Sequence, residues 1–150
     1  TDFDRLSIAS FGAEFCLRIL ESHLPVRDIF ITLTNFLFYL DQDMPPLIAI
    51  NAFLAKVFHV LGYSPANGGG FKNISNESIA LLHQLLAMSF KDLALYQSEF
   101  AKKDQRALYT VLSEFLHYHV PGIPAAGFTS WKLVNEILTK ESPDLLPRLA

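Results

Sequence analysis

The chain has 150 residues, of which 51% are hydrophobic and 13% aromatic, so it carries enough apolar material for one sizeable core and disorder is excluded. Twelve Lys and Arg residues against 15 Asp and Glu leave a formal net charge of −3, without the basic excess of domains that bind DNA by themselves. The single cysteine, Cys16, excludes an intrachain disulfide and a cysteine-based zinc site. No apolar run reaches the roughly 18 residues of a membrane span, and we expect one cytoplasmic domain.

Helical periodicity begins with a predicted helix over residues 6–22. Phe11 and Phe15 lie on its apolar stripe, and Cys16 is expected to be a small buried core residue beside them. Pro25 is expected to open a second helix that reaches residue 40, because proline is tolerated in the first helical turn. The second helix is apolar nearly all round, which predicts a position at the centre of a bundle.

A third helix is predicted over residues 47–61, where Phe53, Val57 and their apolar neighbours recur at the i, i+3, i+4 spacing. Gly62 is expected at the C′ position that follows this helix, because glycine enters the left-handed region without a steric penalty. Residues 64–76 contain three consecutive glycines and are expected to form one long loop.

The second half of the chain is predicted to contain four further helices. Ser75 is the expected N-cap of the first of them, because a serine hydroxyl accepts a hydrogen bond from the first helical turn. With the three helices before them, they predict an all-α, single compact bundle of six or seven helices in one domain, residues 1–150. The four are residues 76–88; residues 90–97; a long helix from Lys102 or Lys103 to residue 118; and residues 129–138, capped by Thr129 or Ser130.

His117 and His119 are the side chains that come nearest to a catalytic or metal-binding pair. Their i, i+2 spacing places them on different faces of a regular helix, so they do not share one metal ion. An all-α enzyme that uses either histidine with a carboxylate such as Glu114 remains as an alternative. No segment matches a calcium loop, a phosphate-binding loop or a nucleophile elbow. We therefore expect no enzyme, no metal and no cofactor.

The basic residues of the chain are densest at the predicted start of the long helix. Cations at that position oppose the helix dipole and are sometimes retained for binding anions, although a plain solvated surface is the alternative. Tyr96 and Tyr109 lie close in sequence and add aromatic rings to which a nucleic acid base can stack. The candidate partner- or DNA-binding residues are Lys91, which joins the cluster if the short helix packs alongside, and Lys102, Lys103 and Arg106.

Six segments of the chain, taken in order, resemble the C-terminal helical domain of the bacterial recombination mediator family RecO, in the form found in Bacteroidetes. The most specific of them ends a helix on Leu-Gly-Tyr-x-Pro at residues 61–65. The family's first and second helices are matched by residues 5–21 and 25–40, its signature helix by 53–65, its helix pair by 75–97, and its closing helices by 106–122 and 128–138.

The chain departs from the family pattern at three places. Many members carry a four-cysteine zinc module after Gly-Tyr-x-Pro, and this chain has a glycine-rich segment without cysteine there, so no metal is carried over. Thr129 stands where a basic residue usually precedes Ser130, which weakens a DNA contact at that point. The family's N-terminal OB-fold is absent from this chain, which we expect to be a fragment or a variant that has lost the barrel.

The resemblance implies a non-enzymatic role in DNA repair and homologous recombination. Members of the family anneal complementary strands and, with RecR, help to load RecA onto DNA coated by the single-stranded DNA-binding protein. In some of them the helical domain binds the acidic, Phe-ended tail of that binding protein. The implied partners are thus RecR and this tail, with single-stranded DNA bound weakly or through the missing OB-fold. The alternative is an all-α adaptor or structural interaction domain without a role in DNA repair.

Overall fold

The structure is a computed structural model that describes residues 2–20, 26–42, 44–63, 74–119, 134 and 136–138. Every regular element within these residues is a helix, which confirms the predicted all-α bundle. The elements of this described part are α1 (Asp2–Leu20), α2 (Val26–Asp41), α3 (Pro46–Val60), α4 (Asn76–Ala87), α5 (Phe90–Tyr96), the short 3-10 helix η2 (Gln97–Glu99) and α6 (Lys102–His119).

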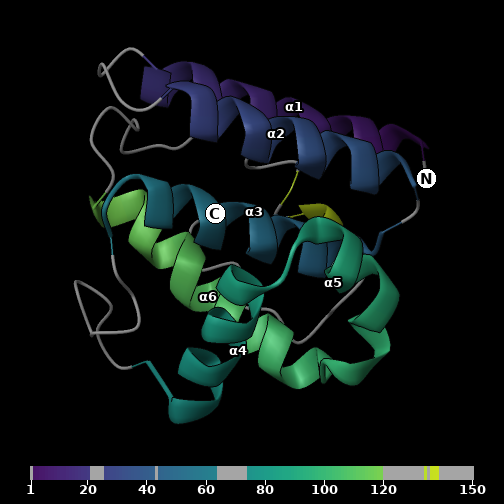
Figure 1. Cartoon of the computed structure of the whole chain (residues 1–150), viewed down its shortest axis with the longest axis vertical. Helices are drawn as coiled ribbons and strands as arrows, with labels where there is room; N and C mark the ends of the chain where they lie inside the picture. The colour runs from purple at the N-terminus through teal and green to yellow at the C-terminus, as the bar shows by residue number, and fades with distance from the viewer. Residues whose placement is uncertain are drawn as a thin grey trace.

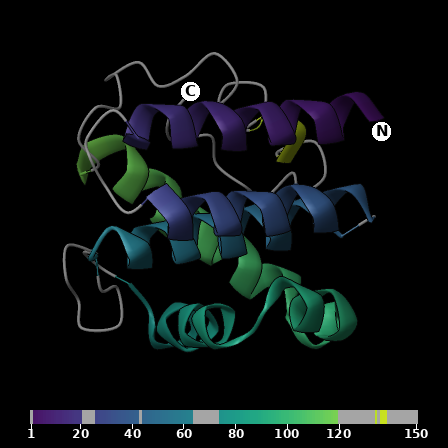
Figure 2. The same ribbon diagram turned by 45° about the horizontal axis from the view of Figure 1, so that its top comes forward.

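The helix at the centre of the bundle is α3, and the expectation that the second helix lies there is wrong. Figure 1 shows α1 and α2 side by side along one edge of the molecule, and Figure 2 shows the same pair after rotation. The third helix packs against α2, α4 and α6, and eleven of its residues are buried. Helix α2 instead exposes Phe30 (64%), Ile31 (45%) and Phe38 (56%) to solvent.

Helix α3 takes the central position because it is more apolar than α2 and carries small side chains: three of its 15 residues are polar or charged, against six of the 16 in α2. Ala49, Ala52 and Ala55 are all fully buried, and their short side chains let neighbouring helices approach α3 closely from several directions. The described face of α2 that packs inward carries large rings instead, among them Phe36. Composition and side-chain size therefore both favour α3 as the surrounded helix.

Aromatic rings fill the core between the layers. Phe36 of α2 stacks on Phe53 of α3 with ring centroids 4.5 Å apart, and Phe15 of α1 meets Phe53 edge-on at 5.9 Å. On the other side of α3, Phe58 packs against Phe115 of α6 at 5.0 Å. Such ring pairs add directional contacts to the burial of apolar area, so they fix the relative positions of α1, α2, α3 and α6.

Helices α1 and α2 approach each other closely at Gly12. A Cβ atom added at this position would lie 2.8 Å from Cε2 of Phe36 and 3.4 Å from Cδ1 of Leu33. Real Cβ contacts are longer, so only glycine allows this spacing between the two helices. Cys16 lies one turn further along α1, is 3% exposed, and confirms the expected buried thiol.

The end of α3 confirms Gly62 as the residue that terminates the helix. Gly62 has φ of +91°, its N–H donates to the carbonyl of His59, and the N–H of Tyr63 donates to the carbonyl of Phe58, both at 3.0 Å. This pair of hydrogen bonds is a Schellman motif. The ring of Tyr63 then packs edge-on against Phe115 at 4.9 Å, so the turn also ties α3 to α6.

Helices α4 and α5 each begin with a serine cap, and the sequence analysis predicted the first of the two. The Ser75 hydroxyl accepts a hydrogen bond from the N–H of Ser78 at 3.1 Å, which confirms Ser75 as the N-cap of α4. Ser89 caps α5 in the same way, through the N–H of Asp92 at 3.1 Å. The predicted short helix over residues 90–97 is divided into α5 and η2.

The remaining predicted boundaries agree within a few residues or lie outside the described residues. Helix α1 begins at Asp2, four residues before the predicted start, and α6 begins at Lys102 as expected. Val134 and residues 136–138 are helical, and Val134, Ile137 and Leu138 are buried in the core. Outside the description lie Pro25, residues 64–73 of the loop predicted over residues 64–76, and the predicted caps Thr129 and Ser130.

Candidate functional site

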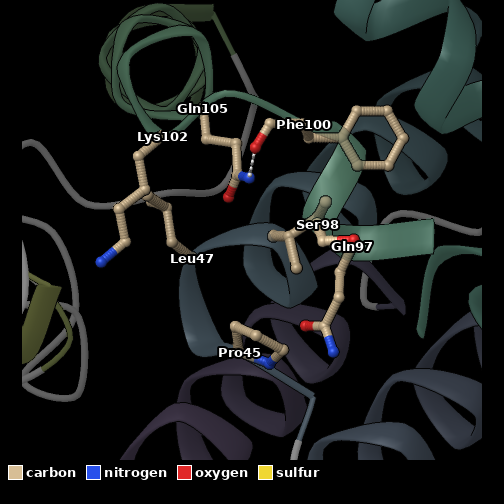
Figure 3. A pocket seen from close by; sticks show the side chains of 8 residues that line it. Pro45, Leu47, Gln97, Ser98, Phe100, Lys102 and Gln105 are labelled. Atoms are coloured by element: carbon tan, nitrogen blue, oxygen red, sulfur yellow. Dashed lines mark hydrogen bonds between the residues drawn. The ribbon is translucent and has the colours of Figure 1, made fainter. Parts of the chain in front are cut away.

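A pocket of about 590 Å³ opens where the start of α3 meets η2 and the start of α6 (Figure 3). The segments that build it are far apart in the sequence, so the pocket exists only in the folded chain. Its lining combines apolar and polar side chains with one cation. The lining residues are Pro45, Leu47, Ile48, Gln97, Ser98, Phe100, Lys102 and Gln105.

The wall formed by α3 is apolar. Pro45 is the N-cap residue of α3, and Pro46 occupies its first turn, where the missing N–H of proline costs no hydrogen bond. The helix that starts here supplies Leu47 and Ile48, which are 6% and 1% exposed. They form the buried floor of the pocket, and the exposed Pro45 and the half-buried Phe100 add the apolar surface that a ligand can contact.

The opposite wall is held in place by two hydrogen bonds in series. Nδ2 of Asn51, a fully buried residue of α3, donates to the carbonyl oxygen of Gln105 at 2.9 Å. Nε2 of Gln105 donates in turn to the carbonyl oxygen of Phe100 at 3.0 Å, the bond drawn in Figure 3. The first turns of α6 and the segment before it are therefore fixed relative to α3.

Gln97 brings an unsatisfied polar atom to the pocket. Its Oε1 is buried and has no hydrogen-bond partner among the described residues. Figure 3 shows its amide group reaching toward Pro45, across the pocket from Lys102. A buried acceptor without a donor costs free energy, and the Gln97 amide must turn before an N–H group of a ligand can reach its oxygen.

Three of the four predicted cations lie on the first two turns of α6. Lys102 and Lys103 are exposed, and Lys102 lines the pocket. Arg106 is half-buried and takes part in an interaction within the fold. Ala101, which precedes the helix, has no side-chain oxygen to cap it, so the positive end of the helix dipole adds to the two lysines, while Asp104 opposes them.

Lys91 is exposed on α5, whose main packing partner is α2, and it is not a lining residue of the pocket. That Lys91 joins the three cations of α6 stays a prediction. Among the predicted aromatic partners, Tyr96 is 49% exposed but Tyr109 is 6% exposed, and burial raises the pKa of its hydroxyl. Tyr109 is therefore a core residue and offers no ring for stacking.

The histidines do not define a site in the described part of the chain. His59 and His83 are exposed, and no group of three or more His, Cys, Asp and Glu side chains there is placed to hold a metal ion. The side chains of His117 and His119 lie outside the described set. No helix within that same set is long and apolar enough to cross a membrane.

Lys56 is a structurally important cation that the sequence analysis missed. Its Nζ donates to the carbonyl oxygen of Met88 at 2.6 Å and lies 5.7 Å from the centre of the Phe90 ring. Partial burial lowers the pKa of Lys56. The ammonium group thereby links the C-terminal end of α4 to the start of α5. Because the contact joins residues 32 positions apart in the sequence, no local sequence pattern predicts it.

Residues 1–67 match the family model described as recombination protein O C terminal. The match spans α1, α2, α3 and the Gly62 turn, and it supports a RecO-type C-terminal helical domain, whose family acts in DNA repair and recombination. The resemblance of residues 75–138 lies beyond the matched range and stays a prediction. No curated protein and no solved structure matches the chain.

Proposed function

We propose that this RecO-type domain serves DNA repair and homologous recombination as a protein-interaction module. Its pocket at the start of α6 binds the acidic, Phe-ended tail of the single-stranded DNA-binding protein. The terminal ring of the tail occupies the apolar wall of α3, and its carboxylates face Lys102 and Lys103. The resemblance to the RecO family supports the choice of the tail as partner. The apolar and basic lining of the pocket supports the choice of this pocket as its binding site.

The observation that carries the proposal is the coincidence of an apolar wall and a cation in one pocket. Pro45 and Phe100, which are exposed and half-buried, offer apolar surface for a ring above the buried Leu47 and Ile48. Lys102 lines the same pocket. A carboxylate near Lys102 also gains from the positive end of the α6 dipole. A peptide that ends in an aromatic residue among acidic ones uses both features at once.

Gln97 supports a peptide rather than a small anion as the occupant. Its buried Oε1 accepts a hydrogen bond that nothing in the described residues donates. A peptide main chain brings N–H groups, whereas an isolated carboxylate brings only acceptors at neutral pH. A peptide N–H group would satisfy this oxygen once the Gln97 amide turns toward the pocket.

The remaining partners follow from the family resemblance. In this proposal the domain contacts RecR and contributes to the loading of RecA without performing covalent chemistry. The formal net charge of −3 argues that single-stranded DNA is bound weakly by this chain, or by the OB-fold that the resemblance places before it. Lys91, Lys103 and Arg106 remain candidate contacts beside Lys102.

The test is a titration of the whole chain with a fluorescent tail peptide, followed by anisotropy at low and moderate salt. We expect saturable binding that weakens as salt rises and is lost when the terminal Phe is deleted. Lys102→Glu should weaken binding by roughly tenfold or more at low salt. Arg27→Glu is the matched control, because it makes the same change of charge at an exposed residue of α2 outside the pocket.

A second variant tests the apolar part of the site without changing charge. Ser98 is exposed and lines the pocket, so Ser98→Trp should fill the space that the ring needs and abolish binding while the chain stays folded. If the peptide fails to bind at high concentration, or if Lys102→Glu and Ser98→Trp bind it like the unaltered chain, the tail-binding function is refuted. RecR contact or the adaptor function would then be the account to pursue.

A further inference from the structure

The outward face of α2 is apolar at its centre and charged at its two ends. Phe30, Ile31 and Phe38 are 64%, 45% and 56% exposed. Arg27 near the start of the helix and Asp41 at its end are exposed as well. Helix α2 lies beside α1 along one edge of the molecule in Figure 1.

The order of residues on this face is symmetric about Thr34. Residues seven apart lie nearly in line on a helix, so Arg27, Thr34 and Asp41 follow one line along α2. Phe30 and Phe38 lie four residues before and four residues after Thr34. When a second α2 is laid against the first in the opposite direction, Arg27 therefore faces Asp41 and Phe30 faces Phe38.

Thr34 is suited to the centre of such a contact. Its hydroxyl donates to the carbonyl oxygen of Phe30 in the same helix at 2.8 Å, so the polar group is already satisfied. The methyl group of Thr34 then adds to the apolar surface. A hydroxyl without a partner would have to be desolvated at a cost of about 1–3 kcal/mol, and the internal bond reduces that cost.

We propose that the outward face of α2 binds a second copy of this chain, with the two α2 helices antiparallel about a two-fold axis at Thr34. Such an interface is isologous, so each contact between Arg27 and Asp41 occurs twice. The ends of the face bear Arg27, Asp28 and Asp41, a balance that disfavours the acidic tail as its occupant. The dimer is independent of the pocket at the start of α6.

The size of the face predicts a weak, concentration-dependent dimer. A helix of the length of α2 (16 residues) extends about 24 Å, and stable dimers usually bury about 800 Å² on each partner. Sedimentation equilibrium of the whole chain over a wide range of concentrations should therefore show a reversible monomer–dimer equilibrium. A chain that stays monomeric at the highest concentrations measured would overturn the proposal.

Charge-reversal variants test whether Arg27 of one copy meets Asp41 of the other across the proposed dimer interface. Arg27→Asp and Asp41→Arg should each weaken the dimer by roughly tenfold, because each turns two attractive pairs into repulsive ones, and the double variant should restore the dimer. Both reversals improve the charges at the ends of α2 relative to the helix dipole, so a weaker dimer would not reflect a weaker helix. Lys103→Asp on α6 is the control with the same kind of reversal away from the face.

Phe38→Asp should abolish the dimer and leave tail binding unchanged, whereas Lys102→Glu should do the opposite. These two variants separate a failure of the dimer from a failure of the proposed function. A dimer that tolerates Phe38→Asp and both charge reversals would lie on another surface and would refute the assignment. A double variant that remains as weak as the single ones would refute the antiparallel register.

Discussion

Asn51 of α3 donates a hydrogen bond of 2.9 Å to the main-chain carbonyl of Gln105 of α6, in the fully buried interior next to the pocket. The same Gln105 holds the carbonyl of Phe100 through its side chain at 3.0 Å. A single buried amide therefore sets the position of the helix start that carries Lys102. The stability of the core and the geometry of the proposed binding site are linked through this residue.

Asn51→Leu should destabilise the fold and weaken tail binding together. Loss of the buried hydrogen bond should cost about 1–3 kcal/mol, measured by urea unfolding. Asn51→Asp should cost more, because a buried carboxylate would face the Gln105 carbonyl without a donor. If Asn51→Asp proved as stable as the unaltered chain, the bond to Gln105 would have no structural role.

Gly12→Ala should destabilise the chain although alanine is the better helix former by about 1 kcal/mol. The added methyl group would lie 2.8 Å from Phe36 and push α1 away from α2, which we expect to cost about 1–3 kcal/mol in net stability. Ser10→Ala, at an exposed position of α1, is the control and should be neutral or slightly stabilising. A stabilised Gly12→Ala variant would show that the two helices are further apart than described.

Lys56→Met should cost about 1–3 kcal/mol in the free energy of unfolding, because the carbonyl of Met88 loses a charged donor in a partly buried place. Lys91→Met on the exposed surface of α5 is the matched control and should stay within about 0.5 kcal/mol. Equal effects of the two substitutions, measured in parallel urea unfolding curves, would contradict the assigned role of Lys56.

Cys16 should make the chain less stable at alkaline pH. Burial raises the pKa of its thiol from 9.0 to about 12, so the folded state keeps the proton that the unfolded state loses. The stability it contributes is present below pH 9 and is lost between pH 9 and about 12, by at most about 1.4 kcal/mol per pH unit.

The measurement for Cys16 is the difference in unfolding free energy between the chain and its Cys16→Ala variant as pH rises. The comparison cancels the effect of Lys56, whose lowered pKa acts with the opposite sign. A thiol reagent should also label Cys16 slowly in the native chain and rapidly in urea. A difference that does not change with pH, or fast labelling of the native chain, would contradict the buried thiol.

Local signals predicted the local features of this fold. Ser75 and Gly62 were identified from sequence because a cap or a helix stop depends on the few residues around it. The order of burial between α2 and α3 also follows from composition, although we expected the reverse. Six of the 16 residues of α2 are polar or charged, against three of the 15 in α3, and the alanines of α3 further allow several neighbours to approach it.

In the candidate site, too, the sequence predicted the local features and missed those that depend on the folded chain. Lys102 and Lys103 stood out in the sequence as cations at a helix start, and the structure places Lys102 at a pocket. The apolar wall and the unsatisfied Gln97 were not identified, because they come from segments about 50 residues apart that meet only after folding. That Lys91 joins the cluster stays a prediction.

The central claim is that the tail of the single-stranded DNA-binding protein occupies the pocket at the start of α6. The most direct test is a tail peptide that carries a photoactivatable phenylalanine analogue at its end, cross-linked to the chain and mapped by mass spectrometry. We predict cross-links to Leu47 and to residues 97–100, reduced by Ser98→Trp and by an excess of unlabelled tail. Cross-links concentrated on the outward face of α2, unaffected by Ser98→Trp, would contradict the account.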